Sequence, residues 1–161
     1  MLDFAYVMDF DPVDRQILDI LRQDGRASHA FIAKQVGLSA PAVGKRVSKL
    51  EQAGVILGYR AVLDHTAIGL PIAAFVMITP QPRKPAQRLV DRLLELPEVE
   101  ALYAVAGEYS FIALVRAPSP STLDVLLDRI FMLEGVEATR TAVVLRTAAE
   151  RATFLPTDST T

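Results

Sequence analysis

A run of small and basic residues between Gly37 and Gly54 has the side chains that a nucleic-acid contact needs. Lys45 and Lys49 are four residues apart, so a helix would place both ammonium groups on one face. Such cations bind DNA phosphates or the O6 and N7 atoms of guanine, and a small side chain such as Ala42 can meet a thymine methyl group. The pattern predicts a helix that enters the DNA major groove.

The charge distribution favours the same interpretation. The chain of 161 residues has a formal net charge of −2, yet residues 26–60 hold six basic residues against one acid, Glu51. Local positive charge in an acidic chain is typical of a phosphate-binding surface. The alternative is a solvated face on which Arg46 pairs with an acid such as Glu51 or Asp19. The residues predicted to contact DNA are Ser28, Ser39, Pro41, Ala42, Lys45, Arg46, Lys49 and Arg60.

Three short helices are predicted to position these side chains. Asp11-Pro12 begins the first, because aspartate is a good N-cap and proline fits the first helical turn. Ser28 begins the second and Ser39 the third, joined by a turn of about three residues, which is a helix-turn-helix. The apolar edge of the third helix comprises Val43, Val47 and Leu50.

Two further features flank or interrupt this unit. Gly44 lies inside the third helix, where glycine costs about 1 kcal/mol relative to alanine; it could permit close packing on DNA or on the first helix. Residues 55–63 are β-prone and bounded by glycine, and they are predicted to form a short strand pair or wing.

The second half of the chain has the order β-α-β-β-α-β, the ferredoxin-like unit. The strands are predicted at 72–78, 99–106, 110–116 and 136–145, and the helices at 86–96 and from Ser119-Pro120 onward. The predicted fold class is therefore α+β, with a winged helix-turn-helix followed by a ferredoxin-like βαββαβ domain. The predicted boundaries are 1–64 for the DNA-binding domain with an arm at 1–10, 65–71 for a linker, 72–146 for the second domain and 147–161 for a tail.

The predicted strands are apolar on both faces, as in Ile72–Ile78. Two helices can cover only one face of such a sheet, and contiguous apolar patches of this size are rare on monomers. A second copy of the same sheet is the simplest cover, so we expect a homodimer that forms an α/β sandwich.

Composition argues against several other classes. The chain has no cysteine, so it has neither disulfides nor a cysteine-based metal site. The N-terminus lacks the basic residues of a secretory signal, and the apolar run 68–78 is too short to span a bilayer, so a cytoplasmic protein is expected. His29 and His65 lack ligand spacing and are interpreted as surface residues. No metal, cofactor or catalytic set is predicted.

These motifs together resemble those of the Lrp/AsnC, or feast/famine, family of prokaryotic transcription factors. The likeness covers about residues 11–146. The motifs that carry it are Asp14–Leu18, Asp24–Ser28, Val36–Ser39, Arg46–Ile56, Gly58–Ala61, Gly69, Gly107–Tyr109, and Gly135-Val136 with Thr139 and Thr141. The resemblance implies a transcriptional regulator that binds double-stranded DNA. It also implies dimers that commonly assemble into octamers, and an effector that is an amino acid or a related metabolite.

The resemblance also implies an effector site near the turn between the second and third strands. It points to Gly107, Glu108, Tyr109 and Ser110, with Thr139 and Thr141 from the fourth strand as neighbours. The family usually has aspartate where Ser110 stands, so a carboxylate that would hold an ammonium group is missing. From the residues alone, Gly107–Tyr109 could be only a hairpin turn.

Two other functions are compatible with the same plan. Proteins similar to the family act as sirohaem decarboxylases, but they need a histidine-bearing pocket in the second domain, and no histidine follows His65. An architectural DNA-binding protein without an effector is the other alternative, and a footprint without sequence preference would favour it.

Overall fold

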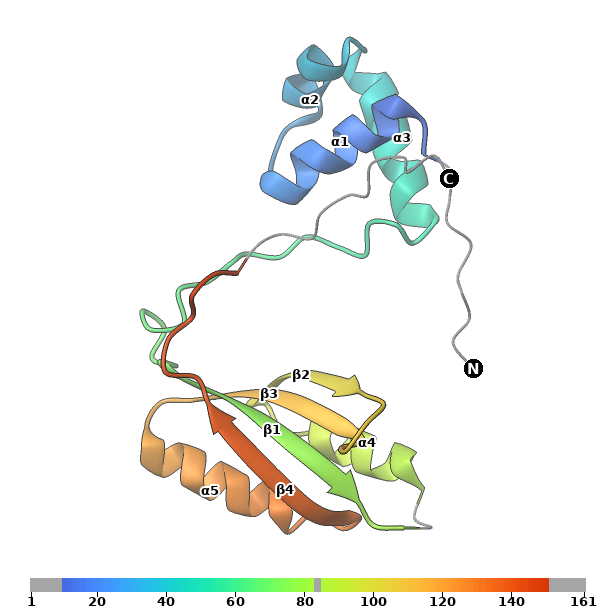
Figure 1. Ribbon diagram of the computed structural model, residues 1–161. Helices are drawn as coiled ribbons and strands as arrows, with labels where there is room; N and C mark the ends of the chain where they lie inside the picture. Colours follow the sequence, from blue (N-terminus) through green and yellow to red (C-terminus); the bar gives the residue numbers. More distant parts are fainter. Residues whose placement is uncertain (1–9, 83–84, 151–161) are drawn as a thin grey trace. The chain divides into compact units, whose positions relative to one another are not determined.

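The N-terminal unit of the computed structural model is built from α1 (Pro12–Gln23), α2 (His29–Val36) and α3 (Ala40–Gln52) (Figure 1). The structure describes residues 10–82 and 85–150. The three helix starts predicted from cap residues are confirmed. The cap oxygen accepts a hydrogen bond from a backbone N–H group three residues on, over 2.8 Å at Asp11, 3.1 Å at Ser28 and 3.4 Å at Ser39.

The three helices enclose a small apolar core. Val43, Val47 and Leu50 of α3 are buried, as their helical spacing predicts. They pack in one cluster with buried residues of α1 and α2, which are Ile17, Leu18, Ile32 and Ala33. Packing of this edge turns the opposite edge of α3 toward solvent.

The predicted wing at residues 55–63 is wrong, since no strand forms within this segment. Val55 and Ile56 pack against the helical core, but Leu57 and Val62 are 93% and 96% exposed. A β-prone sequence becomes a strand only when another strand offers hydrogen bonds, and no strand in residues 10–82 or 85–150 pairs with the segment. Tyr59 holds the segment instead, because its hydroxyl donates to Oε1 of Glu51 over 3.1 Å.

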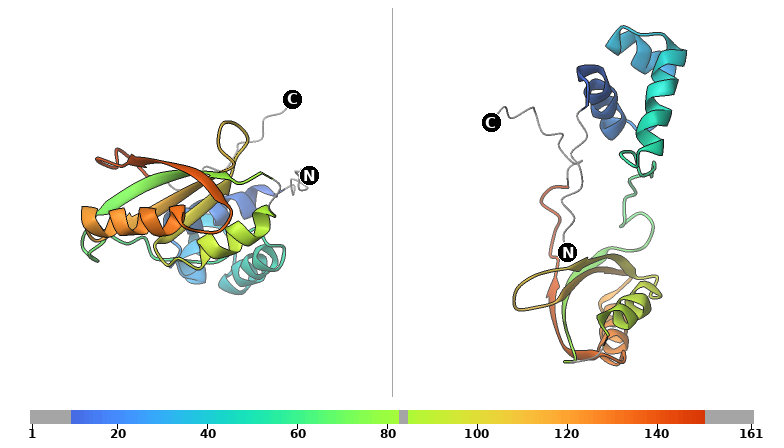
Figure 2. Two further views of the ribbon diagram at one scale, coloured as in Figure 1. Left: turned by 90° about the horizontal axis from the view of Figure 1, so that it is seen from below. Right: turned by 90° about the vertical axis from the view of Figure 1, so that its right-hand side faces the viewer.

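The C-terminal unit has the predicted β-α-β-β-α-β order. Its elements are β1 (Ile72–Pro80), α4 (Ala86–Leu94), β2 (Val99–Ala104), β3 (Phe111–Ala117), α5 (Pro120–Phe131) and β4 (Val136–Val143). The strands form one antiparallel sheet in the order β2-β3-β1-β4, so β1 and β3 are central. Both helices lie on the same face of the sheet (Figure 2).

The two faces of this sheet have different surroundings. On the helix-covered face, β1 contributes Ala74, Val76 and Ile78, each fully buried. The opposite face has no helix over it within the described chain, although it is also apolar. The strand register places on it Ala73, Phe75, Met77, Ala101, Tyr103, Ile112 and Leu114.

The chain divides into two units near residue 62, and the segment predicted as a linker belongs to the second unit. It is a hydrogen-bonded turn, which we call the entry turn (residues 64–70). Oδ1 of Asp64 accepts from the backbone N–H groups of Thr66 and Ala67 at 2.9 and 3.2 Å, and the N–H of Leu70 donates to His65 at 2.7 Å. The predicted arm, except residue 10, and most of the predicted tail lie outside the described residues.

Candidate nucleic-acid interface

The outer edge of α3 presents two lysines on one face. Lys45 and Lys49 are exposed and four residues apart, and within the described chain neither ammonium group has an ion-pair partner. Pro41 is exposed at the start of the same helix, and Ala42 is half-buried beside it. This edge therefore carries two cations, and the first turn of the helix has only small side chains. Both features allow α3 to approach the wall of a DNA groove closely.

Arg46 has intramolecular partners on the same helix face where DNA contact is predicted. Nη1 donates to Oδ2 of Asp11 at 2.6 Å and to Oδ1 of Asp14 at 2.7 Å. The backbone N–H of Asp14 and the Arg46 guanidinium lower the pKa of Asp11, and the two carboxylates raise the pKa of Arg46. The guanidinium thus fixes α3 to the start of α1.

The alternative that Arg46 pairs with an acid is confirmed, but Glu51 and Asp19, the two acids named from the sequence, are not its partners. Asp19 pairs with Arg22 at 2.6 Å, and Glu51 accepts a hydrogen bond from Tyr59. The true partners are 35 and 32 residues away along the chain, and only the folded packing of α1 on α3 brings them together. Contact of Arg46 with DNA stays a prediction, beside the positioning role that its ion pairs support.

The remaining predicted DNA residues occupy three places. Ser28 and Ser39 are the caps of α2 and α3, and a capping hydroxyl keeps its own hydrogen for donation to another group. Arg60 is exposed in the extended segment after the helices, beside Tyr59. Burial and the neighbouring Glu51 carboxylate raise the pKa of Tyr59.

Gly44 has a neighbour that sequence reasoning did not find. A Cβ atom at this position would lie 3.2 Å from Nδ1 and 3.4 Å from Cε1 of His29, so the imidazole fills the space of the missing side chain. The helix that packs here is α2 and not the first helix. No local sequence signal links the two residues, because the contact arises from the crossing of α2 over α3.

Substitution of Gly44 by alanine is expected to stabilise the N-terminal unit by about 0.5–1 kcal/mol, the usual helix-propensity gain. His29 is exposed and can move the few tenths of an ångström that the new methyl group requires. Thermal unfolding followed by circular dichroism measures the effect. The control is G54A, which should destabilise because Gly54 has φ of +70°. A loss of stability in G44A that H29A restores would show that the imidazole cannot move.

The second predicted site is the β2–β3 turn. The backbone N–H of Val105 donates to Ser110 at 2.9 Å and closes the turn, and Gly107 adopts φ of +144°, which other residues rarely tolerate. Gly107 and Glu108 are exposed, while Tyr109 and Ser110 are half-buried. Oε1 of Glu108 accepts from the Tyr109 hydroxyl at 3.0 Å.

Thr139 and Thr141 lie on a different face of the β-sheet from Glu108. The register pairs them with Ile78 and Val76, whose side chains point to the helix-covered face. Glu108 instead lies 3.6 Å from Arg140, on the other face of β4. An apolar groove of about 380 Å³ adjoins the root of the turn, and sequence reasoning missed it because its walls come from α4, β2 and β3. Its lining includes Val90, Leu94, Leu102, Ala104 and Phe111.

No helix in residues 10–82 or 85–150 is long and apolar enough to cross a membrane. Within the same ranges, no group of three or more acidic or histidine side chains is arranged to hold a metal ion.

A capped three-helix unit with a cationic recognition helix, joined to a helix-backed antiparallel sheet, defines a helix-turn-helix DNA-binding protein with an appended α+β domain. Residues 10–51 match the AsnC-type helix-turn-helix domain, and residues 73–154 match the Lrp/AsnC ligand binding domain. The chain belongs to the Lrp/AsnC family of transcriptional regulators, as its sequence motifs indicate.

Individual relatives support this assignment over most of their length. The HTH-type transcriptional regulator LrpA of Mycobacterium tuberculosis is 41% identical over 137 residues, which cover 85% of this chain and 91% of that protein. The leucine-responsive regulatory protein of Rhizobium meliloti is 34% identical, with 86% and 91% covered. A solved structure of a feast or famine regulatory protein from M. tuberculosis, complexed with L-methionine, is 40% identical with a TM-score of 0.87 and covers 92% of this chain and all of that one.

Proposed function

We propose that this regulator reads DNA as a homodimer, with Lys45 and Lys49 of each α3 as its cationic contacts. The uncovered apolar face of the sheet supports dimerisation, because a face containing Phe75 and Tyr103, 41% and 55% exposed, favours burial against a second copy. A symmetric dimer would present two recognition helices to half-sites about one helical turn, ~34–36 Å, apart.

The proposal includes an amino acid as the effector, bound at the β2–β3 turn. Three observations support it: the match of residues 73–154 to a ligand binding domain, the L-methionine complex of the M. tuberculosis relative, and the apolar groove beside the turn. The ligand would contact Gly107–Ser110, with its side chain toward Phe111. Because Ser110 is no carboxylate, the ammonium group would be held by Glu108 instead.

We propose further that the protein acts by binding and not by catalysis. The site residues are cations on a helix and a hairpin turn, which suit phosphate and metabolite recognition. The affinities for effector and for DNA would then be linked. An effector that favours one arrangement of the assembly would change the DNA affinity by some factor, and bound DNA would change the effector affinity by the same factor.

Selection of bound fragments from genomic DNA, with and without a panel of amino acids, tests the proposed function. We expect a small set of enriched fragments that share a two-fold symmetric motif, and we expect at least one amino acid to change the enrichment. Enrichment without any shared motif would contradict sequence-specific regulation. An unchanged set across the panel, together with no amino acid binding in calorimetry, would contradict the effector and leave DNA reading intact.

Replacement of Lys49 by alanine should weaken binding to all DNA sequences by a similar factor, because a phosphate contact carries no base information. The slope of log K against log salt should become smaller by about 1. Fluorescence anisotropy at several salt concentrations measures both quantities. The matched control is K34A, which removes the same charge from α2 and should change the slope less. An unchanged slope in K49A would contradict the phosphate contact.

A further inference from the structure

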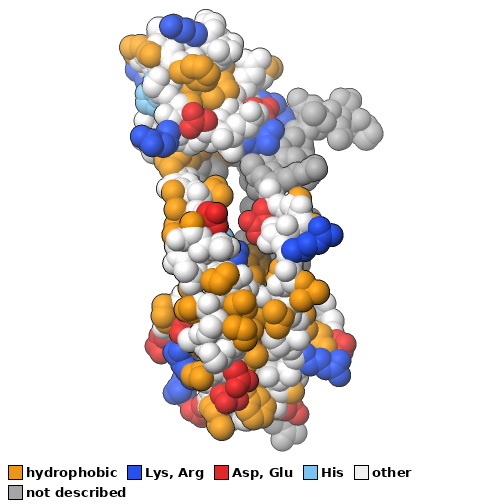
Figure 3. Space-filling view, turned by 90° about the vertical axis from the view of Figure 1, so that its left-hand side faces the viewer, with side chains coloured by type: hydrophobic (Ala, Val, Ile, Leu, Met, Phe, Trp, Pro, Cys, Tyr) orange, Lys and Arg blue, Asp and Glu red, His pale blue; other side chains and the backbone are white. Residues whose placement is uncertain are grey.

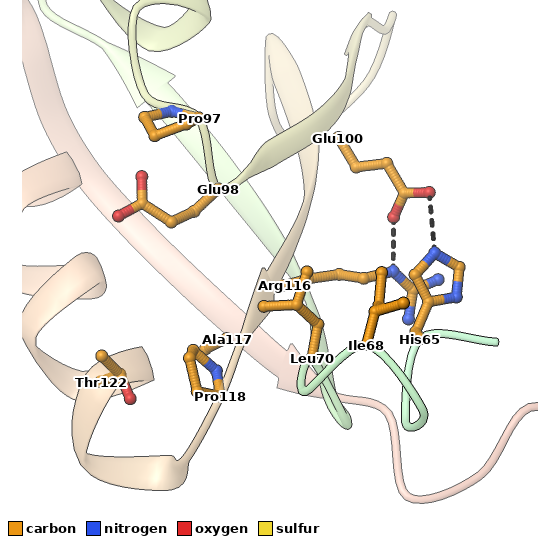
Figure 4. A pocket seen from close by; sticks show the side chains of 10 residues that line it. All are labelled: His65, Ile68, Leu70, Pro97, Glu98, Glu100, Arg116, Ala117, Pro118 and Thr122. Carbon is orange, nitrogen blue, oxygen red and sulfur yellow. Dashed lines mark hydrogen bonds and ion pairs between the residues drawn. The ribbon is translucent and has the colours of Figure 1, made fainter. Parts of the chain in front are cut away.

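A cavity of about 540 Å³ lies at the end of the sheet opposite the β2–β3 turn. Its walls come from the entry turn, the beginning of β2, the end of β3 and the first turn of α5, all within the C-terminal unit (Figure 4). The two sites lie at opposite ends of β3, about 20 Å apart at ~3.3 Å per residue. The cavity is thus separate from the predicted effector site, and its size is typical of small-molecule sites.

The walls of this cavity are mostly hydrocarbon. Ile68 and Leu70 of the entry turn stand opposite Pro97, Ala117 and Pro118. Ile68 is 51% exposed, so its side chain stays accessible at the cavity although it is apolar. Hydrophobic side chains also gather on this side of the C-terminal unit in the space-filling view (Figure 3). An apolar occupant would remove this surface from water and gain free energy in proportion to the area buried.

The charged groups around the cavity neutralise one another. Nε of Arg116 donates to Oε2 of Glu100 at 2.6 Å, and Nε2 of His65 lies 3.6 Å from the other oxygen of that carboxylate (Figure 4). Glu98 points away from this group, and its Oε1 accepts from Arg129 at 2.7 Å.

Glu98 is held as an anion by its neighbours. Burial alone raises the pKa of the Glu98 carboxyl, but its own backbone N–H and the Arg129 guanidinium outweigh burial and lower the pKa. Each lining carboxylate therefore has a guanidinium partner. Within the described chain, Oε2 of Glu98 is buried without a hydrogen-bond partner, so the lining keeps one acceptor for an N–H or O–H group of a ligand.

We propose that this cavity binds an uncharged, largely apolar small molecule of the size of one or two aromatic rings. A zwitterionic amino acid does not fit this chemistry, because its carboxylate would meet the Glu98 and Glu100 carboxylates and cations already bonded to them, and a buried charge without a partner costs several kcal/mol. The site is thus distinct in location and in ligand class from the amino acid site, and it does not depend on the proposed function.

Occupancy of the cavity would fix the entry turn. The ligand would join Ile68 and Leu70 to the ends of β2 and β3, and fewer openings of the turn would expose its backbone. The N–H groups that report this are those of Ile68, Gly69 and Leu70, which donate within the turn at 3.2, 3.1 and 2.7 Å. The turn is the segment by which the chain enters this unit.

Indole and L-tryptophan form a matched pair of probes for the full-length protein, since they share a ring system and differ in charge. Calorimetry should give indole a Kd on the order of 0.1–1 mM, as expected for a ligand of this size. Hydrogen exchange should slow at residues 68–70 with indole. Tryptophan should not slow exchange there, even if it binds at residues 105–110.

Two variants locate the indole site. I68D places a charge at the cavity on an exposed turn and should weaken indole binding at least tenfold, while L145D adds the same charge at a 96% exposed position and should not. Circular dichroism checks that both remain folded. The proposal is overturned by the absence of saturable indole binding, by equal binding to I68D, or by equal protection of residues 68–70 with tryptophan.

Discussion

Replacement of Phe75 by aspartate is expected to convert the protein from a dimer to a monomer at micromolar concentration. Phe75 lies near the middle of the uncovered sheet face, between Leu114 on β3 and Ala142 on β4. The change removes an aromatic contact worth about 1.5–3 kcal/mol and leaves a carboxylate in an apolar interface, which costs several kcal/mol more. The dimer dissociation constant should rise at least a hundredfold.

Sedimentation equilibrium measures this change against the 17.6 kDa mass of one chain. The control is F131D, which makes the same substitution at a residue 51% exposed on the helical side and should leave the dimer intact. Circular dichroism should show a folded F75D, because Phe75 is already partly exposed in the single chain. A monomeric wild-type protein, or a dimeric F75D, would refute the proposed interface.

Replacement of Arg46 by methionine should lower DNA affinity at least tenfold while leaving the salt slope nearly unchanged. The guanidinium holds Asp11 and Asp14 at 2.6 and 2.7 Å, so its loss frees the start of α1 from α3 and lets the recognition helix shift. In a shifted helix the long side chains of Lys45 and Lys49 would still reach phosphates, while contacts to base edges would lose their alignment, so affinity falls and the number of phosphate contacts does not. Anisotropy at several salt concentrations separates the two effects.

Two further variants distinguish positioning from phosphate contact by Arg46. R46K keeps the charge but cannot bond both carboxylates in the same geometry, so it should be impaired almost as much as R46M. In a double-mutant cycle, D14N should cost little once Arg46 is gone. Full activity of R46K together with a shallower salt slope in R46M would assign Arg46 to DNA and not to α1.

Local chemistry explains why most elements could be predicted from the sequence. Asp11, Ser28 and Ser39 begin helices because each cap bonds an N–H group only three residues away, and the apolar run of β1 marks a strand that is short and rich in β-prone residues. The sheet order and the single helical layer likewise follow from the β-α-β-β-α-β pattern.

The features that could not be predicted from the sequence depend on contacts between residues that are distant along the chain. The segment 55–63 has β-prone residues, but no strand of the described chain pairs with it. The sequence pattern shows the β-prone residues and does not show whether a pairing strand is present. The partners of Arg46, the contact of His29 with Gly44, and the cavity behind the entry turn all depend on how separate elements pack. In the sequence, the residues that line the cavity belong to the predicted linker and to the ends of predicted strands, and none of them forms a motif that indicates a site.

The two hydrophobic clusters have a thermodynamic consequence. One is centred on α1–α3 and the other on the sheet with α4 and α5, and among the described residues they share none. Each cluster can lose its packing while the other keeps it, so unfolding need not be all-or-none. Calorimetry would then resolve two heat-absorption peaks: G44A would move the one that belongs to the helices, and indole the one that belongs to the sheet.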